Sequence, residues 1–235
     1  MEKVRILWSG ITGRTGREAL ELVKNRDDVE IVAGICRSDS SYYNYEQLDE
    51  IKEDFDIIVD FSHKDSFDKM LAFALKVGKP IIIGTSGLDD YQLKAFADAS
   101  YTIPIFRGGN FRFEVKKFID AVVEYAKTYN GDHLELIETH YKTKKIPSET
   151  AKVVAKRVFD ETGKIVDIKS FLEYDDLIND WRVDNLHCRV VGFKELADDV
   201  LSIASMMKNK EANGVYDLDR LFSLSKNDIY GTKHI

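Results

Sequence analysis

One stretch of the chain combines residues suited to proton transfer with residues suited to anion binding. His140 is followed four residues later by Lys144, and Ser148 then opens an amphipathic run. An imidazole exchanges protons near neutral pH, and an ammonium group attracts a carboxylate. Ser148 is a favourable N-cap, and a helix N-terminus binds anions through its unpaired N–H groups and its dipole. We therefore expect a carboxylate substrate here, with His140 as the proton donor. The simpler alternative is a solvated polar loop.

The elements that must position these residues follow from the surrounding pattern. Residues 133–138 alternate polar and apolar side chains, which predicts a strand that leads to His140. Pro147 cannot continue a strand interior, and it pushes the residue before it out of the helical region. Apolar residues then recur at helical spacing through residues 148–162. The stretch therefore reads as strand, loop and helix N-terminus.

Composition narrows the class of protein. The chain has 235 residues, of which 44% are hydrophobic and 32% charged, with a net charge of -7. Such a chain is long enough for one large or two small cores, and its acidic balance argues against nucleic acid as a partner. Cys36 and Cys188 form neither a disulfide framework nor a zinc pattern, and we expect no metal. No signal peptide or membrane-length apolar stretch is evident, so a cytoplasmic location is expected.

The N-terminal residues predict a nucleotide-binding turn. Residues 4–9 are apolar and partly β-branched, the glycines Gly10, Gly13 and Gly16 follow, and then a helical pattern begins. In dinucleotide-binding folds such glycines allow a tight turn and a close approach to the pyrophosphate. The spacing here is GxxGxxG, with Thr12 where the common fingerprint has its second glycine. A plain strand–helix turn is the alternative.

The end of the second predicted strand bears on cofactor choice. Residues 29–35 form the strand, and Cys36, Arg37 and Ser38 follow with no acid before Asp39. An acid at this position favours NAD, whereas an arginine favours the 2′-phosphate of NADP. The pattern therefore favours NADPH over NADH, unless Arg37 is simply a surface residue.

Further strands alternate with helices as far as residue 110. Apolar runs at 55–61, 80–84 and 103–106 are separated by helical patterns at 65–77 and 89–100. This alternation predicts a Rossmann-type, doubly wound parallel sheet, with ligands beyond the carboxyl ends of its strands. After residue 110 the order changes to helices at 113–129 and 148–162, strand-like tracts at 165–172 and 181–193, and a helix at 194–208. We predict an α/β dinucleotide-binding domain over 1–110, an α+β substrate-binding domain over 111–196, and a segment 197–235 that packs back on the first domain.

Five motifs in order resemble the 4-hydroxy-tetrahydrodipicolinate reductase (dihydrodipicolinate reductase) family. They are GITGRTGR at 10–17, VDFS at 59–62, GTSG at 84–87, GGNF at 108–111 and ETHYKTKKIPSET at 138–150. The tail GVYDLDRLF is also similar, although the resemblance is loose beyond residue 150. It implies a Rossmann domain, a substrate domain with a mixed sheet, and reduction by NADPH or NADH in lysine and diaminopimelate biosynthesis. It also implies a homo-oligomer, a tetramer in the family, built partly from the substrate-domain sheet.

The resemblance also implies roles for individual residues. His140 and Lys144 match the catalytic pair, and the substrate-contacting positions are Tyr141, Lys144, Glu149 and Thr150. The positions that match cofactor contacts are Gly10, Ile11, Thr12, Gly13, Arg14, Thr15, Arg37, Phe61, Gly84, Thr85, Ser86, Gly108, Gly109, Asn110 and Phe111, with Cys36 beside Arg37.

The chain departs from the family at several positions. Tyr141 stands where a second His is usual, Glu149 replaces a Gly, and the loop after Lys144 is one residue short. A carboxylate at an anion site weakens anion binding unless it points away. Two alternatives therefore stay open: a dehydrogenase acting on another imine or amino dicarboxylate, and a non-catalytic cofactor-binding paralogue.

Overall fold

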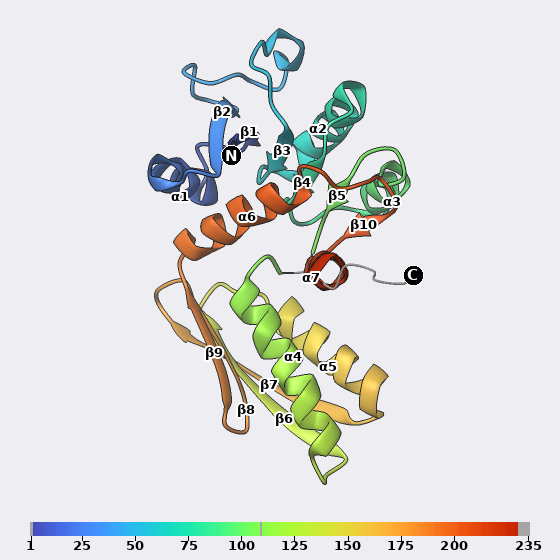
Figure 1. Cartoon of the computed structure of the whole chain (residues 1–235). Coiled ribbons are helices and arrows are strands. Elements are labelled where there is room, and N and C mark those ends of the chain that lie inside the picture. Colours follow the sequence, from blue (N-terminus) through green and yellow to red (C-terminus); the bar gives the residue numbers. More distant parts are fainter. Residues whose placement is uncertain (1, 109, 230–235) are drawn as a thin grey trace, which may run out of the picture. The chain divides into compact units, whose positions relative to one another are not determined.

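The computed structural model describes residues 2–108 and 110–229, with side chains placed up to Ser223. The chain forms two compact units, one made of residues 1–108 and 196–235 and the other of residues 109–195. Figure 1 shows the elements of both units in chain order. Over the described ranges, no helix is both long enough and apolar enough to cross a membrane.

The first unit is built on a six-stranded parallel sheet in the order β10-β5-β4-β3-β1-β2. The strands are β1 (Val4–Ser9), β2 (Val29–Ile35), β3 (Ile57–Asp60), β4 (Ile81–Ile83), β5 (Ile105–Phe106) and β10 (Val215–Tyr216). The central strands are apolar on both faces because helices cover both faces, as parallel sheets require. The predicted doubly wound parallel sheet is confirmed.

The helices of this unit pack on the two faces of the sheet. Helices α2 (Lys64–Val77) and α3 (Asp90–Ala99) bury their apolar stripes against one face. Helices α1 (Arg14–Leu22) and α6 (Lys194–Met207) lie on the other (Figure 1). Local signals set their ends: Asp89 and Gln92 form a capping box for α3, and Gly78 ends α2 in a left-handed conformation. Short 3₁₀ turns at Val23–Asn25 and Leu48–Glu50 and the C-terminal helix α7 (Leu218–Ile229) complete the unit.

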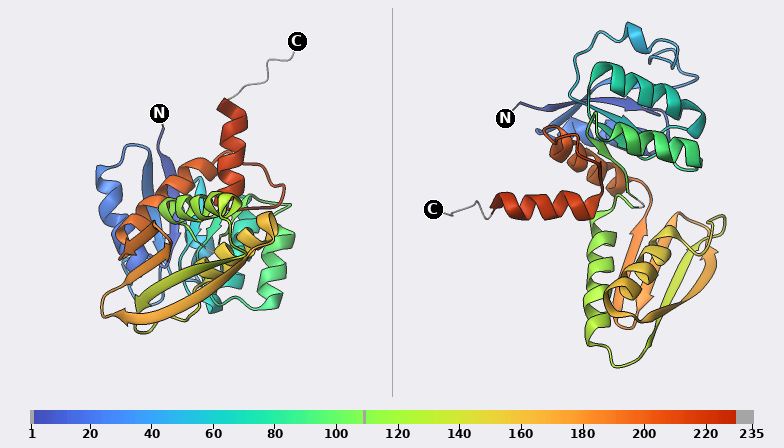
Figure 2. Two further views of the ribbon diagram at one scale, coloured as in Figure 1. Left: turned by 90° about the horizontal axis from the view of Figure 1, so that it is seen from below. Right: turned by 90° about the vertical axis from the view of Figure 1, so that its right-hand side faces the viewer.

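The second unit packs two helices on one face of a mixed sheet. The strands are β6 (His133–Tyr141), β7 (Ile165–Tyr174), β8 (Ile178–Val183) and β9 (Leu186–Val191), in the order β7-β6-β8-β9. Strand β7 runs parallel to β6, whereas β8 and β9 are antiparallel to their neighbours. Helices α4 (Phe113–Thr128) and α5 (Glu149–Thr162) bury the core on one face (Figure 2).

Two elements differ from the predictions. The tract predicted over 181–193 is part of a hairpin, because Asp184 adopts a positive φ of 52° and turns the chain between β8 and β9. The strand predicted at 103–106 is shorter and begins at Ile105. Strand β10 and helix α7 were not predicted. The other predicted helices and strands lie where their periodicity places them, within one to three residues at most ends.

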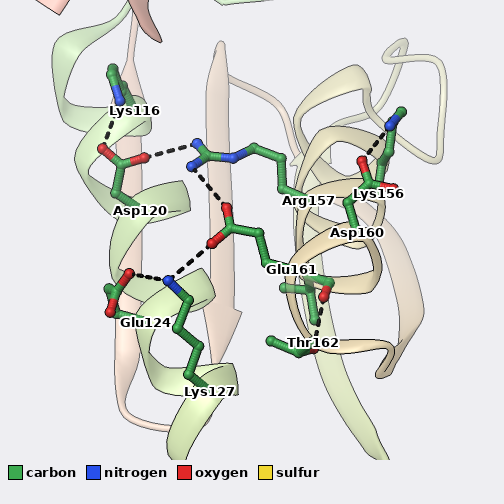
Figure 3. A network of polar contacts seen from close by, with 10 residues as sticks. Lys116, Asp120, Glu124, Lys127, Lys156, Arg157, Asp160, Glu161 and Thr162 are labelled. Atoms are coloured by element: carbon green, nitrogen blue, oxygen red, sulfur yellow. Dashed lines mark hydrogen bonds and ion pairs between the residues drawn. The ribbon is translucent and has the colours of Figure 1, made fainter. Parts of the chain in front are cut away.

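An ion-pair network joins α4 to α5 (Figure 3). Arg157 on α5 lies 2.8 Å from Asp120 on α4 and 3.6 Å from Glu161 on its own helix. Lys127 on α4 completes the link, with 3.0 Å to Glu161 and 2.6 Å to Glu124. The network crosses between the two helices twice, through Arg157–Asp120 and through Lys127–Glu161.

Candidate active site

The carboxyl ends of three parallel strands converge on Phe61. Gly10 follows β1 with φ at 81°, and a Cβ atom there would lie 2.3 Å from the Phe61 carbonyl oxygen. A Cβ atom at Gly84, after β4, would lie 2.4 Å from the Phe61 ring. No side chain fits at either glycine, because Gly10 packs on the main chain of Phe61 and Gly84 packs on its ring. The structure thus brings together three residues that the sequence predicted as cofactor contacts.

The start of α1 has the features of a phosphate site. Gly16 packs directly on the turn, since a Cβ atom there would lie 2.4 Å from the Ile11 carbonyl oxygen. Gly13 is the N-cap and offers no side chain to the first-turn amides. An N-terminus without a side-chain cap leaves room for an anionic group to take that role. Around it, Ile11 and Thr15 are buried, Thr12 is half-buried and Arg14 is exposed.

A buried polar cluster holds the strand ends in place. Asp60, the last residue of β3, is fully buried, and burial raises the pKa of its carboxyl group. Thr85 donates to Asp60 Oδ2 at 2.8 Å and accepts from the Ser62 amide at 3.2 Å. Ser86, the next residue, is exposed. The cluster ties the end of β3 to the end of β4.

Arg37 lies on the surface just after β2. Its guanidinium group donates to Ser66 Oγ at 3.1 Å and lies 3.7 Å from Asp65. Together with Tyr45 and Lys69 it lines a hollow of about 360 Å³. The neighbouring Cys36 is buried and bonds the backbone of residue 39. The hollow also holds Asp65 and Glu46, which pair with Arg37 and Lys69 and offset their charges.

The remaining predicted cofactor residues straddle the two units. Gly108 ends the first unit, whereas Asn110 and Phe111 belong to the second. Gly109 lies outside the described residues. Asn110 bridges two local groups: its amide donates to Thr150 Oγ1 at 3.2 Å, and its oxygen accepts from the Arg112 amide at 2.8 Å.

The most buried polar group of the second unit surrounds His140. Side chains alternate along a strand, so Glu138 and His140 project from the same face of β6, and both are fully buried. His140 Nε2 lies 2.9 Å from Glu138 Oε2, and its ring meets Trp181 edge-on at a centroid distance of 5.3 Å. His140 Nδ1 is buried and has no hydrogen-bond partner among the described residues.

Ser148 connects this pair to helix α5. Its hydroxyl accepts from the Ala151 amide at 3.2 Å, which is the N-cap bond that the sequence predicts. The same hydroxyl donates to Glu138 Oε2 at 2.5 Å and accepts from Trp181 Nε1 at 3.1 Å. The helix start and the Glu138–His140 pair therefore form one unit of structure.

Glu138 is ionised despite its burial. Desolvation by itself raises the pKa of a buried carboxyl group. Here the hydrogen bonds from His140, from the Ser148 hydroxyl and amide, and from Ser170 Oγ at 2.6 Å outweigh it and lower the pKa of Glu138 to about 2. The carboxylate is thus an acceptor for all of these groups.

Lys144 sits in the loop between β6 and α5. It is half-buried, with Nζ 5.8 Å from the centre of the Tyr141 ring. Burial lowers the pKa of its ammonium group, and the charges of Glu138 and Glu149 partly oppose this effect. The ammonium group is therefore partly desolvated, which strengthens its attraction for an anion.

The first turn of α5 shows how the chain accommodates Glu149. The Glu149 side chain is exposed and pairs with Lys152 one turn along the helix, at 2.7 Å. Thr150 is buried beside Asn110. The carboxylate that replaces the family's glycine is therefore neutralised by a neighbouring cation.

Sequence reasoning missed the partners of Glu138. Ser170 on β7 and Trp181 on β8 reach it or its partner Ser148 from strands that lie far away in the sequence. One signal was present: Glu138 occupies the same strand phase as the core residues Leu134 and Leu136. A carboxylate in an apolar phase indicates a buried polar role.

Comparison with known proteins identifies the family. Residues 4–111 match the family model for the N-terminal part of dihydrodipicolinate reductase. The 4-hydroxy-tetrahydrodipicolinate reductase of Caldanaerobacter subterraneus subsp. tengcongensis is 34% identical over 155 residues, which cover 65% of this chain and 62% of that protein. The reductase of Hahella chejuensis is 30% identical over 178 residues, covering 68% of this chain and 67% of that protein.

The matches leave part of each relative uncovered. The aligned residues span less than two thirds of the relative from Caldanaerobacter and of the 30% identical relative from Rickettsia rickettsii. Among solved structures, the dipicolinate-bound dihydrodipicolinate reductase from Paenisporosarcina sp. TG-14 covers 92% of this chain with a TM-score of 0.69. At 16% identity this likeness shows a shared fold. The chain belongs to the 4-hydroxy-tetrahydrodipicolinate reductase family.

Proposed function

We propose that this protein reduces 4-hydroxy-tetrahydrodipicolinate to tetrahydrodipicolinate with NADPH, in lysine and diaminopimelate biosynthesis. The observation that carries the proposal is the single buried cluster that links His140 to the N-terminus of α5 through Glu138 and Ser148. A proton-exchanging ring is joined there to an anion-binding helix end, as a cyclic dicarboxylate substrate requires.

In this proposal the first unit binds the nucleotide. The turn at 10–15 and the start of α1 hold the pyrophosphate, while Phe61 with residues 84–86 and Gly108 lines the nicotinamide. The glycines that pack against Phe61 and the first turn of α1 support this assignment. The bound nicotinamide supplies the hydride. The preference for NADPH rests on Arg37, which follows β2 with no acid before Asp39. A 2′-phosphate there would compete with Asp65 for the Arg37 guanidinium group.

The second unit binds the substrate. Lys144 and the α5 N-terminus at Thr150 hold one carboxylate, the main-chain amide of Glu149 adds a donor, and Tyr141 lines the site. His140 supplies or relays the proton to the carbon next to the one that is reduced. Because His140 is fully covered in this structure, the groups over its ring must move aside when the substrate binds.

The test is a spectrophotometric assay with the dipicolinate precursor and each reduced nucleotide. His140→Ala should lower kcat by roughly 100-fold or more, since general acid catalysis contributes on that scale. It should leave the nucleotide affinity within about twofold, because His140 lies in the second unit and the predicted nucleotide residues from Gly10 to Gly108 lie in the first. Lys144→Ala should raise KM for the dicarboxylate and also lower kcat. Turnover of His140→Ala within a few-fold of wild type would remove His140 from the mechanism.

The two alternatives are not favoured. The relatives from Caldanaerobacter and Hahella both carry the name of this reductase. Glu149, one of the two departures that suggested another substrate, is exposed and paired with Lys152. Activity on an amino-acid panel with none on the dipicolinate precursor would reverse this preference.

Self-association and location complete the proposal. The sheet of the second unit carries its helices on one face only, and the other face exposes apolar side chains of Ile165, Phe171 and Val191. Such a face suits contact with further copies of the chain, as a tetramer would need.

A cytoplasmic location is in keeping with a biosynthetic enzyme that uses a soluble nucleotide.

A further inference from the structure

One buried carboxylate in the second unit has no role in the mechanism described so far. Glu138 is fully buried, and its two oxygens accept hydrogen bonds from three side chains and one main-chain amide. Burying a charge is costly unless it is fully hydrogen-bonded, so a carboxylate retained here indicates a specific task. Among the described residues, the titratable ring that hydrogen-bonds to it is that of His140.

We propose that Glu138 is a positioning residue that holds His140 as the Nε2–H tautomer and leaves Nδ1 to exchange the proton with the substrate. The inference rests on the proposed function, because it assumes that His140 is the proton donor. It adds which ring nitrogen of His140 transfers the proton, and that Glu138 sets the tautomer.

The argument begins with the direction of the hydrogen bond. An ionised carboxylate has no proton to donate, so the 2.9 Å contact requires a hydrogen on His140 Nε2. Histidine has two ring nitrogens, and the bond made by one sets the protonation of the other. In the neutral ring, Nδ1 therefore carries the lone pair. When Nδ1 is protonated, it is the nitrogen with a hydrogen free to transfer.

The surroundings of the ring support this assignment. Nδ1 is buried and lacks a hydrogen-bond partner among the described residues, which is the state expected of a group that awaits a ligand. The Trp181 ring meets the imidazole edge-on and limits its rotation. A proton leaves Nδ1 for the substrate carbon, the ring becomes neutral, and water later restores the proton. Nε2 keeps its hydrogen throughout.

The hydrogen bonds of Ser148 connect Glu138, and through it His140, to the N-terminus of α5. The hydroxyl that donates to Glu138 Oε2 is also the N-cap of α5. The carboxylate therefore orients the imidazole relative to the helix end that holds the substrate carboxylate. This is the arrangement in which an outer residue aligns a catalytic one.

The experiment is long-range ¹H–¹⁵N correlation NMR on the full chain labelled with ¹⁵N-histidine. Spectra are recorded at about pH 8, where a free imidazole is neutral. A His140→Asn variant assigns the signals. We expect His140 to show a protonated Nε2 and an unprotonated Nδ1. In Glu138→Gln, whose amide can donate to the ring, the tautomer should shift toward Nδ1–H, and kcat should fall at least about tenfold with KM for the nucleotide unchanged.

A matched control separates this effect from general damage to the sheet. Asp180 is also buried, and its Oδ1 lies 3.1 Å from His187 Nε2 in the same sheet. Asp180→Asn should alter the His187 signals and leave those of His140 as they are. A wild-type His140 with its hydrogen on Nδ1 would overturn the proposal even if Glu138→Gln does not fold. So would a folded Glu138→Gln that retains the Nε2–H tautomer with kcat within about threefold.

The two proposals fail separately. The tautomer is measured without substrate, so a chain that shows no activity on the dipicolinate precursor would refute the proposed function and leave the Glu138 measurement valid. Conversely, full reductase activity with an unchanged tautomer in Glu138→Gln would refute only the positioning role.

Discussion

The two most deeply buried carboxyl groups, those of Asp60 and Glu138, have pKa values shifted in opposite directions. Burial raises the pKa of Asp60, and the hydroxyl groups of Ser62, Thr85 and Ser9 offset this effect only in part. It also opposes ionisation of Glu138, yet the donors around that residue lower its pKa to about 2. The difference lies in the donors, because Glu138 receives an imidazole, a main-chain amide and two hydroxyl groups. The pKa of a buried carboxyl group is therefore raised in the first unit and lowered in the second.

The free energy of unfolding at acid pH should depend on the hydrogen bonds to the Glu138 carboxylate. Its folded pKa is about 2 and its ordinary value 4.5, so its contribution is complete above about pH 5 and is lost as the pH falls through about 2. At roughly 1.4 kcal/mol per pKa unit, the full contribution is on the order of 3 kcal/mol. Hydrogen exchange of β6 and α5 amides at neutral and acid pH should therefore show a steeper loss of protection in wild type than in Glu138→Gln. Parallel acid profiles would contradict the network.

At the scale of elements, α4 and α5 are joined by charges as well as by their apolar stripes. Burial raises the pKa of Asp120, but Lys116 and Arg157 outweigh it, so the pKa is lowered. Arg157 reaches Asp120 across the helix pair and Glu161 along its own helix (Figure 3). Networks that combine partly buried charges contribute more than isolated surface pairs.

Arg157→Met should loosen the helix pair. We expect a loss of about 0.5–1 kcal/mol in the free energy of unfolding of the second unit at low salt, and a smaller loss at high salt because the pairs are screened. Lys156→Met is the matched control, since the ion pair of Lys156 runs along its own helix to Asp160. Urea unfolding followed by hydrogen exchange of α4 and α5 measures both. Equal effects of the two variants would show that the inter-helix bridge contributes nothing.

At the scale of the molecule, the second unit presents a sheet with one uncovered face. Strand alternation directs Ser170 and Val190 toward the helices and Phe171 and Val191 away from them. The outward side chains are about half exposed, at 44% for Phe171 and 51% for Val191. An apolar face of this kind favours association with another copy of the same chain.

Light scattering coupled to size-exclusion chromatography tests the association. The wild-type chain should have the mass of an oligomer, and Phe171→Glu should reduce it to that of a single chain, because a charge in an apolar interface is strongly unfavourable. Phe159→Glu is the control: Phe159 is 58% exposed but lies on α5, away from the open face. A wild-type monomer, or dissociation by both variants alike, would count against this face.

The sequence by itself determined most of the elements of this protein and their order. Period-two and period-3.6 patterns predict the parallel sheet and the helices, and Ser148 and the glycines after β1 mark where helices begin. These signals are local, because each depends on residues within one or two turns of the chain. The hairpin at Asp184 was missed, since its turn depends on a positive φ that an aspartate only sometimes adopts.

Only the tertiary structure decided which groups surround His140. Ser170 lies 32 residues from Glu138, and Trp181 lies 33 residues from Ser148, yet all of them meet in one buried cluster. Strand order and register bring them together, and these follow from the packing of the whole sheet rather than from any local pattern. The identity of the imidazole could thus be read from the chain, whereas the direction of its hydrogen bonds required the fold.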